Sequence, residues 1–228
     1  MTSAGCVFDA RTSPHPPSNR ARTPSIVTTS MTSGSAFSFS RAAATTAALR
    51  SSGQSIRISG VLIVTGSSAG VYDDLPWIDP LKGFLATAGD RVPLVGVCFG
   101  HQVMAEAFGG GAVKSDKGWG IGLQSYSVSK PAAWMDGAAH VSAPCSHQDQ
   151  VVSLAPGGQV LAGSDFTPFG VLAYGDKAIS MQFHPEFDPA YATALIESRR
   201  GTRFTGEQAD ADFTGYETTH DTARITAL

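Results

Sequence analysis

The fold of this chain is decided by Val92-Pro93-Leu94-Val95-Gly96-Val97-Cys98-Phe99-Gly100-His101-Gln102. The apolar run that ends at Val97 predicts a buried strand, and it breaks at a Gly-x-Cys-x-Gly turn. Such a turn swings a strand directly into a helix and exposes its central side chain above the sheet. Small residues must flank Cys98 because the backbone passes close to itself there. The stretch therefore predicts an α/β fold that presents a reactive cysteine.

A helix is expected directly after the cysteine, because apolar residues recur at helical spacing between His101 and Phe108. The amides and the positive dipole end of this helix would favour a thiolate on Cys98. The amide of Phe99 is the natural first donor to an oxyanion. The alternative is that Cys98 is only a small buried hydrophobic residue at the end of a strand.

A second short apolar run, Ile179 to Phe183, ends in His184-Pro185-Glu186. A nucleophile needs a base, and the base needs a group that orients it. On their own, His184 and Glu186 would be read as surface polar residues after a strand. In the order nucleophile, base and acid they favour a Cys-His-Glu site.

Composition limits the partners of this chain. A length of 228 residues suits one substantial α/β domain. A net charge of −3 and a pI near 6.0 give no electrostatic basis for binding nucleic acid or an anionic membrane. The cysteines are Cys6, Cys98 and Cys145, an odd number without a pattern, so a reducing compartment, the cytoplasm, is expected.

Two regions differ in composition. Residues 1–59 are rich in Ser, Thr, Ala and Arg, and we expect a low-complexity segment that is disordered or atypical of the protein. Its acid-poor start also fits an organellar transit peptide. Residues 60–228 have the pattern of a globular domain. Helices are expected over Trp77–Thr87, His101–Phe108 and Tyr191–Arg200, and strands over Val61–Val64, Leu94–Val97, Gly120–Leu123, Tyr126–Val128, His140–Val141, Gln150–Val152, Val160–Ala162, Gly170–Tyr174 and Ala178–Phe183.

These motifs resemble the class I glutamine amidotransferases that carry a Cys-His-Glu triad, in particular stand-alone domains similar to that of GMP synthetase. The resemblance rests on Gly96–Gln102, on His184–Glu186, on Ser146–Asp149 and on the glycine-containing loop Thr65–Asp74. It implies a flavodoxin-like fold: an open, mostly parallel sheet with helices on both faces and a small antiparallel segment. The family's first strand has only a weak candidate here, Ile26–Thr29.

The resemblance also implies roles for individual residues. The catalytic residues would be Cys98, His184 and Glu186; the oxyanion hole would use Phe99, Gly66 and Ser67; and the substrate would be held by Gln102, Ser146, His147 and Asp149. Each has a plainer reading. Gln102 could cap or pack a helix, and His147 and Asp149 could be surface polar residues flanking a loop.

The expected function is a glutaminase or amidotransferase that releases ammonia from glutamine through a γ-glutamyl thioester on Cys98. The ammonia would pass to a free acceptor or to a partner synthetase. One alternative is a γ-glutamyl peptidase with the same triad, and another is a degenerate, non-catalytic family member. No cofactor is implied, and a metal is not expected because Cys145 and His147 lack the further ligands that zinc requires.

Overall fold

The computed structural model describes residues 27–29, 61–213 and 221–225. Eight strands form the main sheet, in the spatial order β1 (Val27–Thr29), β2 (Leu62–Val64), β3 (Leu94–Val97), β10 (Ala178–Met181), β9 (Val171–Tyr174), β8 (Gly158–Gly163), β5 (Gly120–Val128) and β6 (His140–His147). The pairs from β1 to β10 are parallel, and those from β10 to β6 are antiparallel. A separate antiparallel ribbon contains β4 (Gly111–Lys114) and β7 (Asp149–Ser153).

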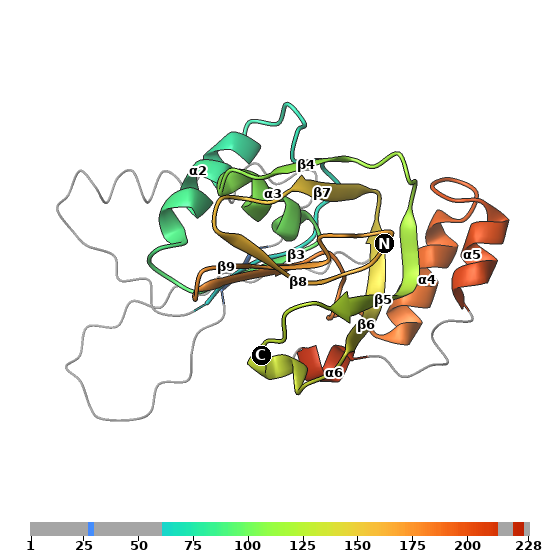
Figure 1. Cartoon of the computed structure of the whole chain (residues 1–228). Coiled ribbons are helices and arrows are strands. Elements are labelled where there is room, and N and C mark those ends of the chain that lie inside the picture. Colours follow the sequence, from blue (N-terminus) through green and yellow to red (C-terminus); the bar gives the residue numbers. More distant parts are fainter. Residues whose placement is uncertain (1–26, 30–60, 214–220, 226–228) are drawn as a thin grey trace, which may run out of the picture.

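The helices lie on both faces of the sheet and at one end of it (Figure 1). They are α2 (Ile78–Ala88), α3 (Phe99–Ala107), α4 (Pro189–Arg199), α5 (Gly206–Phe213), α6 (Thr222–Ile225) and the 3-10 turn η1 (Ala133–Met135). The predicted α/β, flavodoxin-like class is therefore confirmed. The antiparallel part contributes four strands, β9, β8, β5 and β6, that continue the parallel ones in a single sheet.

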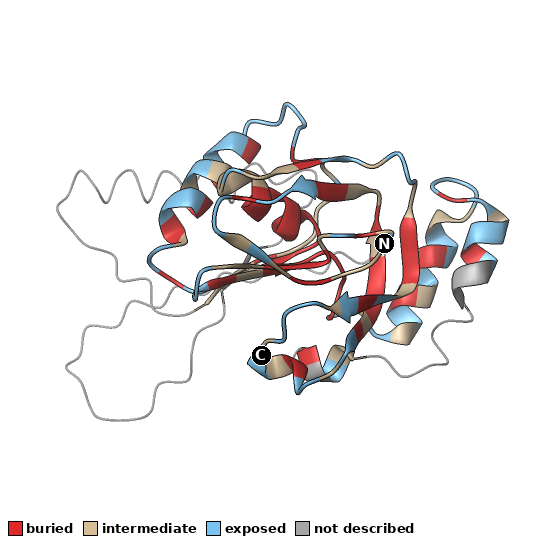
Figure 2. Cartoon of the chain, in the orientation of Figure 1, coloured by how far each residue is buried: buried red, intermediate tan, exposed pale blue. Residues whose placement is uncertain are grey.

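The buried apolar residues form two large clusters, and Figure 2 shows buried segments in the strands of the sheet and in the helices around it. On one face, Leu85 of α2 and Met104 of α3 pack with Leu94 of the sheet. On the other face, Met135 of η1 and Ile225 of α6 pack with residues of β5, β6 and β10. A smaller cluster joins α4 and α5 to β5 through their apolar side chains. The sheet is thus covered on both sides, as expected where helices follow parallel strands.

Most predicted elements are present, with shifted ends. Helix α3 begins at Phe99, two residues before the predicted start, and β5 is one strand where two were predicted. Neither β4 nor α5 was predicted. The weak candidate at Ile26–Thr29 does contribute a strand, because β1 pairs in parallel with β2. The rest of the N-terminal segment lies outside the described residues.

The parallel strands determine where the site forms. Strands β2, β3 and β10 end at the same edge of the sheet, because they are neighbours with one direction. The glycine-containing loop follows β2, Cys98 follows β3, and His184 follows β10 closely in sequence. Open α/β sheets bind ligands at the carboxyl ends of their strands. In the described ranges, no helix is long and apolar enough to cross a bilayer.

Candidate active site

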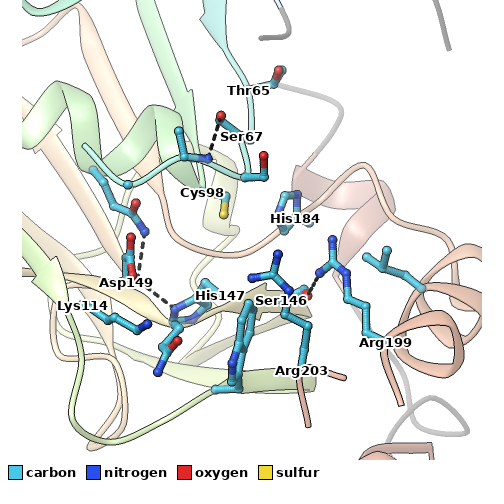
Figure 3. A pocket seen from close by; sticks show the side chains of 18 of the residues that line it. Thr65, Ser67, Cys98, Lys114, Ser146, His147, Asp149, His184, Arg199 and Arg203 are labelled. Atoms are coloured by element: carbon cyan, nitrogen blue, oxygen red, sulfur yellow. Dashed lines mark hydrogen bonds between the residues drawn. The ribbon is translucent and has the colours of Figure 1, made fainter. Parts of the chain in front are cut away.

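The turn at Cys98 is strained and tightly packed. Cys98 has φ 54°, a left-handed backbone conformation that non-glycine residues seldom adopt. A Cβ on Gly100 would lie 1.9 Å from the main-chain oxygen of Val64, and one on Gly96 would lie 2.6 Å from the main-chain oxygen of Gly100. Only glycine fits at either position, as the sequence predicted. Cys98 is the residue just before α3, and the turn directs its side chain toward His184 (Figure 3).

His184 is held between Glu186 and Cys98. Its Nδ1 lies 2.7 Å from Oε1 of Glu186, so the N–H donates to the carboxylate. Its ring stacks on Phe187 with the centroids 4.0 Å apart and the planes 9° from parallel. Cys98 lies close to the imidazole, because a Cβ on Gly66 would be within 4 Å of both side chains. With Nδ1 engaged by Glu186, Nε2 is the nitrogen left to exchange a proton with sulfur.

The charges around His184 favour its protonated form. Burial alone would lower its pKa, but the negative charge and hydrogen bond of Cys98, together with those of Glu186, raise the pKa to about 10. Glu186 is half-exposed, whereas the His184 and Cys98 side chains are buried. The three groups are therefore placed so that a proton can pass between sulfur and Nε2, with a carboxylate that stabilises the protonated imidazole.

The loop after β2 lies directly over this pair. A Cβ on Gly66 would be 3.1 Å from Cε1 of His184 and 3.9 Å from Cβ of Cys98. Ser67 lines the same pocket, and its hydroxyl accepts a hydrogen bond of 3.1 Å from the amide of Ala69. Phe99 is the first residue of α3, and its buried ring packs against Trp77. All three residues predicted for the oxyanion hole thus border Cys98, and their roles stay predictions.

The residues predicted to hold the substrate have different surroundings. Gln102 is buried, and its Nε2 donates to the main-chain oxygen of Asp149 (2.9 Å) and to Oε1 of Gln182 (3.1 Å). The Asp149 carboxylate accepts a hydrogen bond of 3.0 Å from the hydroxyl of Tyr72. Ser146 accepts one of 2.8 Å from Nη1 of Arg199. The residues that line the pocket are Gln102, Ser146 and Asp149, together with their neighbours Tyr72 and Arg199. Substrate binding by Gln102, Ser146 and Asp149 stays a prediction.

His147 is a buried neutral base. Burial, its largest influence, lowers its pKa to about 4, and the charge of His184 acts in the same direction. The neutral ring therefore donates from Nδ1 to the main-chain oxygen of Asp149, 3.1 Å away. Its Nε2 is then an acceptor, and it is buried without a partner among the described residues. His147 lines the pocket and ends β6, whereas the sequence suggested a loop.

The pocket has a volume of about 620 Å³ and extends well beyond Cys98. Sequence reasoning did not single out several residues of its wall: Tyr72, Lys114, Trp119, Phe187, Tyr191, Leu195, Arg199 and Arg203. The interval of four residues from Tyr191 to Arg199 was a usable signal, because residues so spaced share one face of a helix. Nothing in the sequence showed which face α4 turns toward the site. Across the described ranges, no group of three or more His, Cys, Asp or Glu side chains could hold a metal.

Comparison with known proteins shows which family this chain belongs to. The family described as "Glutamine amidotransferase class-I" matches residues 45–199. A glutamine amidotransferase-like protein of Schizosaccharomyces pombe is 29% identical over 64% of this chain and 60% of its own length. A glutamine-hydrolysing GMP synthase of Trichormus variabilis is 35% identical over 55% of this chain and 23% of its own length. Gamma-glutamyl peptidase 5 of Arabidopsis thaliana is 28% identical over 59% of this chain and 57% of its own length.

A solved structure supports the fold. A glutamine amidotransferase from Methylobacillus flagellatus superposes with a TM-score of 0.57 at 23% identity, over 64% of this chain and 59% of that one. At this identity the likeness bears on the fold alone. The chain spans about 60% of the length of the curated relative from Schizosaccharomyces pombe and less than a quarter of the GMP synthase.

Proposed function

This chain belongs to the class I glutamine amidotransferase family, and on that premise we propose that it hydrolyses γ-glutamyl amide bonds through a thioester on Cys98. Glutamine is the simplest such substrate, and its hydrolysis gives glutamate and ammonia. The family match covers more than half of the chain and includes the turn at Cys98 and His184. The observation that carries the proposal is the hydrogen bond of His184 to Glu186, with Cys98 close to the same imidazole at one edge of the sheet.

The proposed reaction has two halves. Sγ of the Cys98 thiolate attacks the γ-carbonyl carbon, and the oxyanion rests on the amides of Phe99 and the Gly66–Ser67 turn. The tetrahedral intermediate collapses by breaking the carbon–nitrogen bond, and His184 gives its Nε2 proton to the departing nitrogen. Water then loses a proton to His184 and attacks the thioester. The carbon–sulfur bond breaks, which releases glutamate and restores the thiolate and imidazolium pair.

Glu186 would act on His184 alone. Its carboxylate keeps Nδ1 protonated, so Nε2 always faces sulfur, and its charge stabilises the imidazolium. The strained turn would hold the sulfur beside the base before substrate arrives, which avoids reorganisation during the reaction.

Purified protein incubated with glutamine tests the proposal. We expect ammonia and glutamate to appear in equal amounts, and Cys98→Ala to abolish both. The matched control is Cys145→Ala, because Cys145 is the other cysteine of the described domain and is buried away from the pocket lining. Turnover that survives Cys98→Ala would overturn the proposal.

A synthetase or another acceptor enzyme is proposed as the user of the ammonia, since one relative is a glutamine-hydrolysing GMP synthase. The second candidate function is γ-glutamyl peptidase activity. The observation that favours it is the extent of the pocket, whose 620 Å³ leave room for a substrate longer than glutamine. A γ-glutamyl dipeptide in the same assay decides between the two, because an enzyme restricted to glutamine will leave it intact.

A further inference from the structure

One wall of the pocket is a stripe of residues at intervals of four: Phe187, Tyr191, Leu195, Arg199 and Arg203. Three of them, Tyr191, Leu195 and Arg199, lie on one face of α4, because residues four apart share a face of a helix; Phe187 precedes the helix and Arg203 follows it. The stripe begins at the catalytic base, since Phe187 stacks on His184. It ends in two guanidinium groups, and Arg203, beyond the end of α4, donates its amide to the main-chain oxygen of Arg199 at 2.9 Å.

In the described part of the chain, the hydrogen bond of Arg199 and the ring contact of Arg203 are both made to neutral groups. Arg199 donates to the Ser146 hydroxyl at 2.8 Å, and Arg203 lies over the ring of Trp119 at 5.6 Å from its centroid. Their neighbour Arg200 is different. It faces away from the pocket and bonds to two carboxylates, those of Glu197 and Asp210, each at 2.8 Å.

The carboxylates that line the pocket already have other partners. Glu186 accepts from His184, Asp149 accepts from Tyr72, and Asp73 accepts from the amide of Gly70. The end of the stripe is therefore a positively charged region of the pocket without a protein anion within bonding distance in the described ranges.

A purely structural role does not explain this arrangement well. A cation at a helix C-terminus stabilises the helix by about 0.3–1 kcal/mol, and Arg199 in the last turn of α4 is placed to do so, but Arg203 lies beyond the end of the helix. The positive charges of Arg199 and Arg203 repel each other, and both side chains are directed into the same pocket (Figure 3). An anion bound between the two guanidinium groups would be attracted to both and would offset their mutual repulsion.

Building on the proposed function, we propose that Arg199 and Arg203 form a subsite for the carboxylate of the leaving group, so that the preferred substrates are γ-glutamyl peptides with a free C-terminal carboxylate. The leaving nitrogen must face His184 to receive its proton, and the stripe starts at His184. Arginine binds a carboxylate through two parallel hydrogen bonds, which fixes its position. The apolar part of the stripe would contact the side chain of the leaving residue. Glutamine, whose leaving group is ammonia, places nothing in this subsite.

The opposite side of the pocket is free for the glutamyl group. Lys114 and Asp149 lie across from His184 and Arg199 in Figure 3, and both line the pocket. They carry the charges that complement an α-carboxylate and an α-ammonium group. The glutamyl head and the leaving group would therefore occupy separate regions on either side of Cys98.

The test compares γ-glutamyl-leucine with γ-glutamyl-leucinamide, which differ only in the charge of the terminal group, and includes glutamine as a third substrate. We expect the wild-type kcat/KM to be about ten- to a hundred-fold higher for the acid than for the amide, as for a charge-assisted hydrogen bond. In Arg199→Gln, Arg203→Gln and the double variant this ratio should fall toward one. Arg200→Gln is the matched control, and it should keep the wild-type ratio.

Other outcomes overturn the subsite. Equal rates for acid and amide in the wild type would do so, and so would a preference that survives the double variant. A uniform loss on all three substrates in Arg199→Gln would show that the arginines hold the glutamyl head instead. If the wild type cleaved none of the three, the proposed function would fail. The subsite would then be decided by titrating Cys98→Ala with acid and amide by tryptophan fluorescence, because Trp119 lines the pocket. Tighter binding of the acid that is lost in the double variant supports the subsite, and equal binding refutes it.

Discussion

Replacing Glu186 by glutamine isolates the charge of the carboxylate from its position. The two side chains have nearly the same shape, and the glutamine oxygen can still accept from Nδ1 of His184, now 2.7 Å from the carboxylate. The imidazole should keep its tautomer and orientation. What it loses is the negative charge that stabilises the imidazolium during proton transfer.

The structure sets the size of this loss. A hydrogen bond to a charged group contributes about 1.5–3 kcal/mol. Glu186 is 47% exposed, so water screens part of the interaction and the lower end applies. A loss of about 1.4 kcal/mol in the transition state corresponds to about a ten-fold fall in kcat/KM. Glu186→Ala, which removes the acceptor as well, should cost more.

The pH profile of kcat/KM with glutamine gives a second readout. Glu186 is one of the groups that raise the pKa of His184 to about 10. Removing a neighbouring negative charge destabilises the protonated imidazole, so the pKa falls and the alkaline limb of the profile should move to lower pH. A residue with only a structural role would not shift this limb.

The control for this experiment is Glu197→Gln. Glu197 is a comparably exposed carboxylate, 2.8 Å from a cationic side chain, but it lies outside the pocket. It should leave both kcat/KM and the pH profile unchanged. The reasoning is refuted if Glu186→Gln matches the wild type in rate and profile, or if it is as inactive as Cys98→Ala.

Three further predictions concern the scaffold. Gly100→Ala should prevent stable folding, because its Cβ would lie 1.9 Å from a backbone oxygen of β2. Gly83→Ala, in open space on α2, should instead raise the midpoint of thermal unfolding by about 2–4 °C. Thermal unfolding followed by circular dichroism measures both effects. Burial lowers the pKa of His101 to about 3 and that of His147 to about 4. The unfolded chain therefore binds more protons between pH 6.5 and 4, so the free energy of unfolding should decrease as the pH is lowered through that window. In denaturant titrations, His101→Asn should reduce the slope of the free energy of unfolding against pH by the equivalent of about one proton. Tyr72→Phe removes the hydrogen bond to the Asp149 carboxylate and should raise KM for glutamine about two- to five-fold with kcat unchanged. An unchanged KM would show that this hydrogen bond does not shape the pocket.

Local sequence was enough to predict the centre of the site. A Cβ on Gly96 or Gly100 would lie 2.6 Å or 1.9 Å from a main-chain oxygen, so both positions require glycine and indicate the turn at Cys98 directly. A short apolar run followed by His184 and Glu186 likewise implied a strand that ends in polar groups. These patterns are local because the turn and the strand ends are formed by adjacent residues.

The pocket wall could not be predicted in the same way. The direction in which α4 faces depends on how Ile196 packs with Ile121 of β5, and these residues are far apart in the sequence. Strand β4 was missed because Gly111–Lys114 is short, and its pairing with β7 comes from a distant part of the chain. Helix α5 is polar and has a single described buried residue, Ala209, so its periodicity is weak.

The most direct measurement is the capture of the intermediate itself. Wild-type protein is mixed with glutamine, quenched in acid within the first turnover, digested and mapped by mass spectrometry. A γ-glutamyl thioester on Cys98 should give a peptide that contains this residue and is heavier by one glutamyl group, and the adduct should be absent without glutamine. Turnover of glutamine without an adduct on Cys98, or with the adduct on Cys145, would contradict Cys98 as the nucleophile.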